Sequence, residues 1–215
     1  MLTDDQTGTR NVKESELGSY LMKNAPKFEY GTLVDDRDGE IYCTVRIGTQ
    51  VWMAENLRYV SVGGVADDDK DSFVYGEVES NVDKYGRLYT WDAAQKVAPE
   101  GWHLPSDEEW GILCDYLASL GGDLPGNAMK AASFWEEKYG FSVGTDSSGF
   151  AAVPAGGRYS MGYFHDAEHH AYFWTSDSEG REYAKYRSLC CRGGRVSCDY
   201  SYRSDAFSVR CVRNV

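Results

Sequence analysis

The sequence predicts an α+β domain, and three observations support this prediction. Segments rich in β-branched and aromatic residues stand towards both ends of the chain, IYCTVRI at 41–47 and FSVRCVR at 207–213. A well-specified amphipathic helix lies between them. The chain has 215 residues, 14% of them aromatic, which suffices for one domain with a hydrophobic core. We therefore expect one compact domain over residues 31–215, with paired terminal strands, after an N-terminal appendage or linker over residues 1–30.

The compact domain is expected to open with a turn at residues 35–39 (DDRDG), followed by the strand at 41–47. Residues 61–72 (SVGGVADDDKDS) are expected to be an acidic loop whose aspartates alternate as in calcium-binding loops. However, Ser72 stands where an EF-hand requires Gly, and Val78 stands where it requires Glu. We therefore expect a plain loop rather than a calcium site.

The best-defined helix begins after Ser106. Ser106 is the expected N-cap, and Glu109 completes a capping box with it. The apolar residues that follow fall on one helical face: Trp110, Leu113, Cys114, Leu117 and Leu120. Gly121 and Gly122 are expected to end this helix. A shorter helix is expected at Tyr89–Val97, ended by Pro99.

The chain beyond this helix shows little regular pattern. Residues 121–135 are expected to be irregular, and short strands are expected at 150–156 and 171–176. Long irregular segments in a compact domain are often functional.

The segment 181–205 has the composition of a binding surface. It reads REYAKYRSLCCRGGRVSCDYSYRSD, and only Ala184, Leu189 and Val196 are aliphatic, so it lacks the alternation of a scaffold strand. Rigid aromatic residues mixed with small polar ones and arginines are typical of recognition surfaces. Tyr200 and Tyr202 are expected to be exposed. The ligand-binding residues that we predict are Trp174, Tyr183, Tyr186, Arg187, Cys190, Cys191, Arg192, Arg195, Cys198, Asp199, Tyr200, Tyr202, Arg203 and Asp205.

The charge is unevenly distributed along the chain. The net charge is −12, yet residues 171–215 hold eight basic and five acidic side chains. An acidic body argues against a nucleic-acid partner. No apolar run approaches the ~20 residues of a membrane-spanning helix. The start, MLTDDQTGTR, lacks a signal region, so we expect either synthesis without a signal or a signal already removed.

The cysteines and histidines do not predict a metal or cofactor. Six cysteines are present, but their spacing does not support a disulfide framework, and no CxxC pair suggests structural zinc. Histidines cluster at 165–170 (HDAEHH), which we interpret as an exposed polar turn because adjacent ligands rarely reach one ion. Neither HExxH nor GxSxG occurs, and helix capping explains the carboxylates Glu108 and Glu109. We predict no catalytic residue, no metal and no cofactor.

Several long words of the sequence, in order, resemble one family. They are RDGEIYCTVRIGTQVWMAENLRY (37–59), YGRLYTWDAAQKVAPEGWHLPSDEEW (85–110), GFAAVPAGGR (149–158), YFWTSDSE (172–179) and FSVRCVR (207–213). Together they look like the Fibrobacter succinogenes major paralogous domain, over about residues 34–215. That family resembles the formylglycine-generating enzyme branch of the C-type lectin fold. The resemblance implies a mixed, loop-rich C-type-lectin-like domain with mostly antiparallel small sheets and two main helices.

The resemblance also bears on function. Ala98 stands where the family usually carries Cys, so a partner such as Cys211 would be left as a free thiol. The formylglycine-generating enzyme uses two cysteines after an Arg-Gly-Gly stretch, but here only Cys198 follows Arg192-Gly193-Gly194 and Arg203 stands at the second position. The EPN, QPD and WND motifs of calcium-dependent lectins do not occur.

Domains of this branch are also targets of diversity-generating retroelements, which rewrite a C-terminal patch by replacing template adenines. The residues that such changes produce from Asn codons, including Tyr, Ser, Asp, Cys, Arg and Gly, dominate segment 181–205, and Asn is absent from it. Chance composition is the open alternative.

We therefore predict a non-enzymatic recognition or adhesion domain, displayed outside the cell, at its surface or on a virion, that binds a protein or a surface glycan. A structural domain of the cell envelope without a diversified site is the second hypothesis. An enzyme of the formylglycine-generating type is the third.

Overall fold

The computed structural model describes residues 28–60, 71–136 and 144–214. The expected appendage, up to residue 27, and most of the acidic loop at 61–72 lie outside the described residues, so the predictions made for them stay predictions. Strand β1 begins at Glu29, two residues before the expected start of the compact part.

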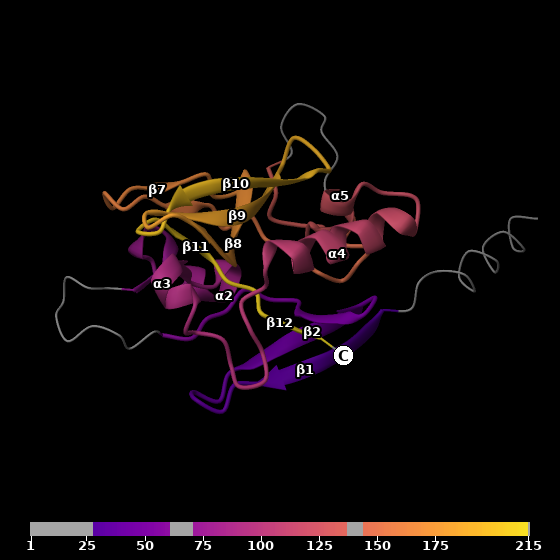
Figure 1. Cartoon of the computed structure of the whole chain (residues 1–215), viewed down its shortest axis with the longest axis horizontal. Helices are drawn as coiled ribbons and strands as arrows, with labels where there is room; N and C mark the ends of the chain where they lie inside the picture. Colours follow the sequence, from indigo (N-terminus) through magenta and orange to yellow (C-terminus); the bar gives the residue numbers. More distant parts are fainter. Residues whose placement is uncertain (1–27, 61–70, 137–143, 215) are drawn as a thin grey trace, which may run out of the picture.

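One sheet joins the beginning and the end of the domain. It has four strands in the order β1-β2-β3-β12 (Figure 1), which are β1 Glu29–Val34, β2 Ile41–Ile47, β3 Gln50–Met53 and β12 Val212–Asn214. Val212 lies opposite Trp52 in the antiparallel pair β12–β3. The predicted strand at 41–47 and the predicted pairing of terminal strands are therefore confirmed.

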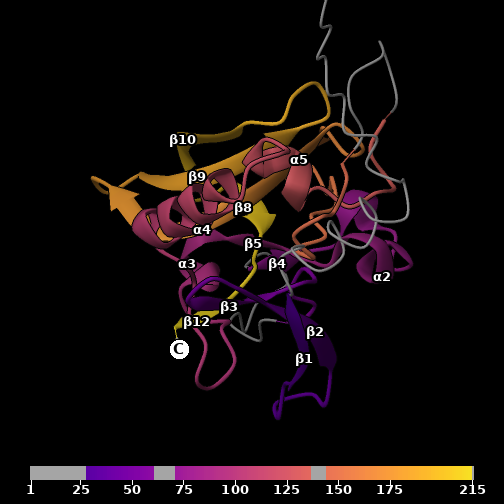
Figure 2. The same cartoon turned by 90° about the vertical axis from the view of Figure 1, so that its right-hand side faces the viewer.

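The second sheet carries the segment of interest at its edge. Its eight strands follow the path β10-β9-β8-β11-β5-β4, and β6 and β7 attach through β11. The pairing is antiparallel throughout except between β11 and β8 (Figures 1 and 2). Its strands are β4 Ser72–Phe73, β5 Leu88–Thr90, β6 Gly157–Arg158, β7 Phe164–His165, β8 His170–Glu179, β9 Tyr183–Cys190, β10 Val196–Tyr202 and β11 Ala206–Ser208.

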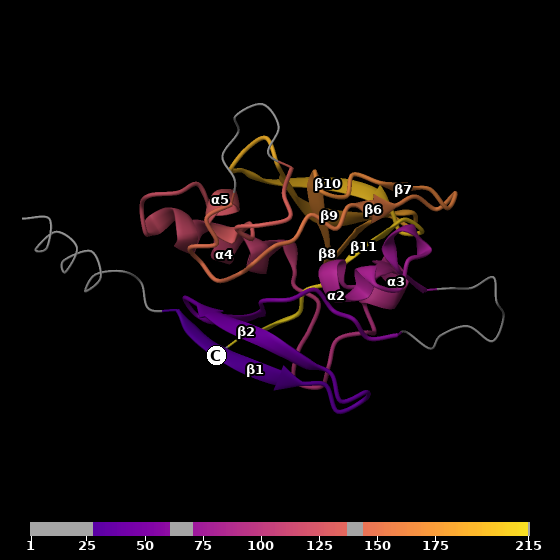
Figure 3. The ribbon, with the colours of Figure 1, turned by 180° about the vertical axis from the view of Figure 1, so that it is seen from behind.

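Four α-helices and a 3-10 turn complete the described part of this α+β domain. They are η1 Tyr75–Glu77, α2 Asn81–Tyr85, α3 Trp91–Ala94, α4 Asp107–Ser119 and α5 Pro125–Met129. Helix α4 lies between the two sheets, as Figures 1 and 3 show. One apolar cluster joins Trp52 of the first sheet, Trp110 of α4 and Phe173 of the second sheet.

Aromatic rings fill the centre of this cluster. The ring centroids of Trp110 lie 5.0 Å from Trp52 and 5.5 Å from Phe173. Phe150 packs edge-on against Trp110 at 5.6 Å. Such pairs contribute about 0.5–1.5 kcal/mol each beyond their burial. The layers are therefore fixed by contacts remote from segment 181–205.

Helix α4 confirms its local signals. The Ser106 side chain accepts a hydrogen bond from the Glu109 backbone, and the Glu109 carboxylate accepts one from the Ser106 backbone. Trp110, Leu113 and Leu117 are buried as predicted. Leu120, in contrast, is 41% exposed. The helix ends at Ser119, so Leu120 is the C-cap residue and does not extend the buried apolar face.

Three predicted elements differ from the structure. Instead of a helix from Tyr89, residues 88–90 form β5, because they pair with β11, and α3 begins only after Thr90, whose hydroxyl caps it. The supposedly irregular stretch 121–135 contains α5. Residues 150–156 form only isolated bridges rather than a strand, at Ala152 and Gly156.

The final predicted strand is divided between the two sheets. Phe207 and Ser208 end β11, whereas Val212 begins β12. The residues between them are buried and cross the interior from one sheet to the other. There the guanidinium of Arg210 donates to Asn56 and to the backbone carbonyls of Phe150 and Ala151. The sequence pattern does not reveal where the chain leaves one sheet and enters the other, because the residues before and after this crossing both belong to strands.

Segment 181–205 is more regular than its composition predicts. It is a hairpin of β9 and β10, paired in register from Val196 opposite Leu189 to Tyr202 opposite Tyr183. Apolar alternation is missing because β10 is the edge strand and both of its faces meet solvent over most of its length. Backbone hydrogen bonds, rather than side-chain burial, hold this strand in place.

Candidate functional site

The open end of the β9–β10 hairpin presents three exposed tyrosines, which we call the tyrosine cluster. Tyr183, Tyr200 and Tyr202 are 38%, 42% and 51% exposed. Tyr183 and Tyr202 lie directly opposite each other, with ring centroids 4.7 Å apart. Side-chain hydrogen bonding raises the pKa of Tyr183 through Tyr202 and that of Tyr200 through Glu179. The predicted exposure of Tyr200 and Tyr202 is confirmed.

Asp107, the first residue of α4, ties this cluster to the scaffold. Its carboxylate accepts hydrogen bonds from Arg187 Nε at 2.7 Å, Lys185 Nζ at 3.4 Å and Cys198 Sγ at 3.3 Å. Burial alone would raise the pKa of Asp107, but these donors outweigh it and lower the pKa. Lys185 also lies 5.8 Å from the centroid of the Tyr200 ring. Arg187 is therefore a largely buried ion-pair partner, whereas Cys198 remains exposed.

Trp174 supports the hairpin from within and does not face solvent. It is fully buried, and its indole N–H donates to the carbonyl of Tyr89 at 2.7 Å. Its ring contacts Phe207 with centroids 4.5 Å apart, and Tyr186 lies edge-on to both. Burial raises the pKa of Tyr186 to about 12. The structure thus places Trp174 in the core and Tyr186 half in it.

A shallow depression borders the tyrosine cluster. It has a volume of about 620 Å³. Arg203 lines it and forms an ion pair with Asp92, while its guanidinium lies 4.2 Å from the centroid of the Trp91 ring. The depression is polar and of mixed charge; the lining residues are Asp71, Thr90, Asp92, Arg181, Glu182, Tyr202, Arg203 and Ser204.

The turn end of the hairpin is anchored, in contrast to the open end. Lys130 Nζ donates to the carbonyls of Cys190 and Gly193, at 3.3 and 3.0 Å. The Gly126 N–H of α5 donates to the carbonyl of Gly194 at 2.8 Å. Burial lowers the pKa of Lys130. The turn is therefore part of the scaffold.

The remaining predicted residues divide between surface and interior. Cys191 is buried, with its sulfur 4.0 Å from His169 Nδ1, and Cys190 is half-buried. Asp205 is only 3% exposed. Three others are exposed and face solvent: Arg192, Arg195 and Asp199. Trp174, Cys191 and Asp205 thus lie where side-chain contact with a ligand requires rearrangement.

Sequence reasoning missed the positioning residues Asp107, Lys130 and Lys185. The sequence near Asp107 does not indicate its contact with Arg187, because that partner lies 80 residues later in the chain. Lys185 could have been found from the hairpin register, which places it opposite Tyr200. Nothing in the sequence near Lys130 indicates its contact with the turn.

Other chemistry in the described residues is limited. Residues 165–170 contain a turn, as expected. His170 is partly buried, however, and this burial lowers its pKa. Within residues 28–60, 71–136 and 144–214, no three His, Cys, Asp or Glu side chains are placed to share a metal ion. All six cysteines are free, including buried Cys211, which shares an apolar cluster with Ala98. Among the described helices, none has the length and hydrophobicity to cross a membrane.

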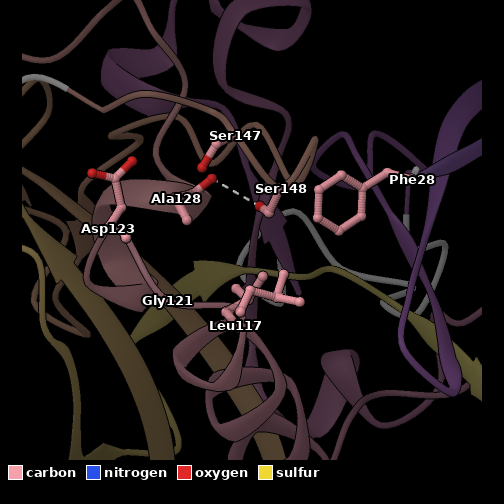
Figure 4. Close-up of a pocket in the computed structure, with 9 residues that line it drawn as sticks. Phe28, Leu117, Gly121, Asp123, Ala128, Ser147 and Ser148 are labelled. Atoms are coloured by element: carbon pink, nitrogen blue, oxygen red, sulfur yellow. Dashed lines mark hydrogen bonds between the residues drawn. The ribbon is translucent and has the colours of Figure 1, made fainter. Parts of the chain in front are cut away.

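A second hollow lies far from the hairpin's open end. Its volume is about 400 Å³, and Figure 4 shows Asp123, Leu117, Ser148 and Phe28 among the residues that line it. Ser148 donates its hydroxyl hydrogen to the carbonyl of Ala128 at 2.8 Å. With one carboxylate, Asp123, and hydroxyls otherwise engaged, its lining does not form a nucleophile–base pair.

Comparison with known proteins finds one family that matches most of the chain. The family model described as the Fibrobacter succinogenes major domain matches residues 45–213, which include β3, every strand of the second sheet, α4 and the whole hairpin. No curated protein and no solved structure matches significantly.

Proposed function

Since the chain belongs to the Fibrobacter succinogenes major domain family, we propose that it is a non-enzymatic recognition domain. Its ligand is a protein, which it contacts through the tyrosine cluster and the neighbouring exposed residues of β10. The observation that carries this proposal is the exposure of Tyr183, Tyr200 and Tyr202 on a strand pair whose other end is anchored.

Rigidity makes such a surface effective. Tyrosine offers a large amphipathic contact with few rotatable bonds, and preorganisation reduces the entropy lost on binding. The ion pairs of Asp107 with Arg187 and Lys185 hold the hairpin against α4 before any ligand arrives. A small, well-packed enzyme site would instead require converging catalytic groups in a cleft, and the depression beside Tyr202 is open and shallow.

The same arrangement supports diversification of the hairpin. Exposed positions such as Tyr200 and Asp199 can change without disturbing the core, whereas Ala184 and Leu189 are fully buried. We propose that a retroelement varies the exposed set and leaves the buried set constant. A near-repeat of this DNA beside a reverse-transcriptase gene is the expected finding. Sibling sequences that vary equally at Leu189 and Tyr200 would contradict the proposal.

The proposal extends to fold and location. The return of β12 to β3, together with long irregular connections around small antiparallel sheets, supports a C-type-lectin-like fold. Display outside the cell, at its surface or on a virion, would give the tyrosine cluster access to its partner. The test of location is immunogold labelling of intact cells and particles; labelling only after permeabilisation would overturn it.

Photo-cross-linking tests the binding function. A benzoylphenylalanine replacing Tyr202 should cross-link one protein from the native organism's surface fraction. The same photoreactive group replacing Leu124, which is 55% exposed beside the anchored turn, at the end of the hairpin opposite the tyrosine cluster, is the matched control. The protein captured from position 202 is then purified, and its affinity for Tyr200→Ala/Tyr202→Ala should fall about tenfold or more. An unchanged affinity, or equal capture from position 124, would refute the proposal; a glycan array signal abolished by the same variant would assign a sugar ligand instead.

A further inference from the structure

A second exposed aromatic feature stands beside the hairpin. The turn between β6 and β7, residues 159–163 (YSMGY), exposes three large side chains, and we call it the 159–163 tip. Tyr159, Met161 and Tyr163 are 45%, 79% and 69% exposed. Figures 1 and 3 show the β6–β7 segment projecting beside the end of β10. The composition of this short segment did not distinguish it in the sequence.

The tip is a defined turn. The Tyr159 N–H donates to the carbonyl of Tyr163 at 2.9 Å, and the Gly162 N–H donates to the carbonyl of Tyr159 at 2.8 Å. The Tyr159 ring stacks on the imidazole of His165 with centroids 4.0 Å apart. The backbone of the tip and the Tyr159 ring are therefore held in place, and the exposed side chains of Met161 and Tyr163 extend from this turn.

Asp205 joins the tip to β10. Its carboxylate accepts hydrogen bonds from the backbone N–H of Ser160 at 2.8 Å and from the hydroxyl of Ser201 at 2.6 Å. Because Asp205 is almost fully buried, these two bonds are shielded from water, which strengthens them. The predicted ligand residue Asp205 thus acts as a positioning residue that couples two surface elements.

The tip and the tyrosine cluster lie on either side of the edge strand. Tyr200 and Tyr202 share one face of β10 with Cys198, whereas Ser201, which reaches Asp205, points to the other face. Because β10 has a free edge, a ligand seated on it can contact both faces.

The chemistry of the tip favours a protein partner with an apolar hollow. None of its five residues is charged, although the chain carries a net charge of −12. That charge opposes approach to an anionic membrane. Small ligands such as sugars are usually held in concave sites, whereas the tip projects. Exposed Met and Tyr side chains are typical of protein contact surfaces.

We propose that the 159–163 tip is a second contact element of the binding site and inserts into an apolar hollow of the protein that the tyrosine cluster binds. This inference rests on the proposed function. The ligand would therefore straddle the edge strand β10, with Asp205 keeping its two contact elements in register.

Site-specific photo-cross-linking distinguishes the two proposals. Benzoylphenylalanine replaces Met161, Tyr202 or, as control, Leu124, and each protein is exposed to the same surface fraction. The expected result is one protein captured from positions 161 and 202 and not from 124. Capture from position 202 alone overturns the proposed contact through the tip and leaves the proposed contact through the tyrosine cluster intact. Capture from 161 alone overturns the proposed function, and capture from neither overturns both.

Affinity measurements with the protein purified from the position-202 adduct complete the test. Met161→Ser/Tyr163→Ser should weaken binding about tenfold or more, because truncating an anchor side chain at an interface lowers the affinity by about this factor. Leu124→Ser should bind like the unmodified protein. The replaced side chains are exposed, so melting temperatures should agree within a few degrees among the three proteins. Unchanged affinity of the Met161→Ser/Tyr163→Ser variant would refute the inference even if both positions cross-link.

Discussion

Replacing Trp174 with Ala tests whether this residue belongs to the scaffold or to the binding surface. Trp174 is fully buried, contacts the Phe207 ring and donates to the Tyr89 carbonyl. Truncation of a buried Trp costs about 3–5 kcal/mol through lost burial and the cavity left behind. Leaving the Tyr89 carbonyl without its donor adds about 1 kcal/mol or more. The expected loss is therefore about 4–6 kcal/mol, a large part of a typical domain's stability of about 5–15 kcal/mol.

The assay is thermal unfolding followed by near-ultraviolet circular dichroism, with Tyr202→Ala as the matched control. For a domain of this size, about 2–4 °C accompanies each kcal/mol, so Trp174→Ala should lower the Tm by about 8–24 °C. Tyr202 is 51% exposed and mainly contacts the Tyr183 ring, so its truncation should cost about 1 kcal/mol, or about 2–4 °C. A Tm loss for Trp174→Ala no larger than that for Tyr202→Ala would refute the assignment of Trp174 to the core.

Three further predictions concern pH, thiols and the anchored turn. Burial lowers the pKa of His170. As pH drops below about 6.5, the unfolded chain binds a proton at His170 more readily than the folded chain, so the free energy of unfolding should fall. Urea midpoints of the His170→Gln variant should show a smaller loss over this pH range. Burial raises the pKa of Cys211 to about 12, so its thiol should react with Ellman's reagent only after unfolding. Exposed Cys43 should react in the native state, slowly at neutral pH and faster as pH rises, because its pKa is also raised; fewer than six reactive thiols in guanidinium chloride would contradict the free-thiol assignment. A Cβ on Gly194 would lie 2.7 Å from the Leu124 side chain, so Gly194→Ala should lower the free energy of unfolding by about 1–3 kcal/mol in a denaturant titration. Gly193→Ala, whose Cβ meets nothing within 4 Å, should leave the free energy of unfolding unchanged.

Local rules predicted α4 and parts of the surface. The capping box of Ser106 and Glu109 involves residues three positions apart, so it needs no knowledge of the rest of the chain. The exposure of Tyr200 and Tyr202 was likewise predictable, since their Ser- and Asp-rich neighbours offer little apolar surface to pack against.

Predictions failed where distant pairing decides the outcome. Tyr89 looked helical in its local sequence, but it pairs with Phe207 in β11 and so forms a strand. Asp205 belongs to a segment with the composition of a binding surface and Trp174 precedes that segment, yet the structure buries both side chains. Composition indicates what a residue can do, and register decides which side of a strand it faces.

The sequence alone determined the α+β class, the capped central helix, the pairing of the first strands with the last one, and a carboxyl-terminal region rich in tyrosine and arginine. All of these follow from local periodicity, composition or the order of the elements, which can be read along the chain. Only the tertiary structure decided which of the other side chains in this region are buried or paired, because Asp107, Lys130 and Asp205 reach the hairpin or the 159–163 tip from positions remote in sequence. Hydrogen bonds and packing between distant segments carry no local pattern, and they set the boundary between scaffold and surface.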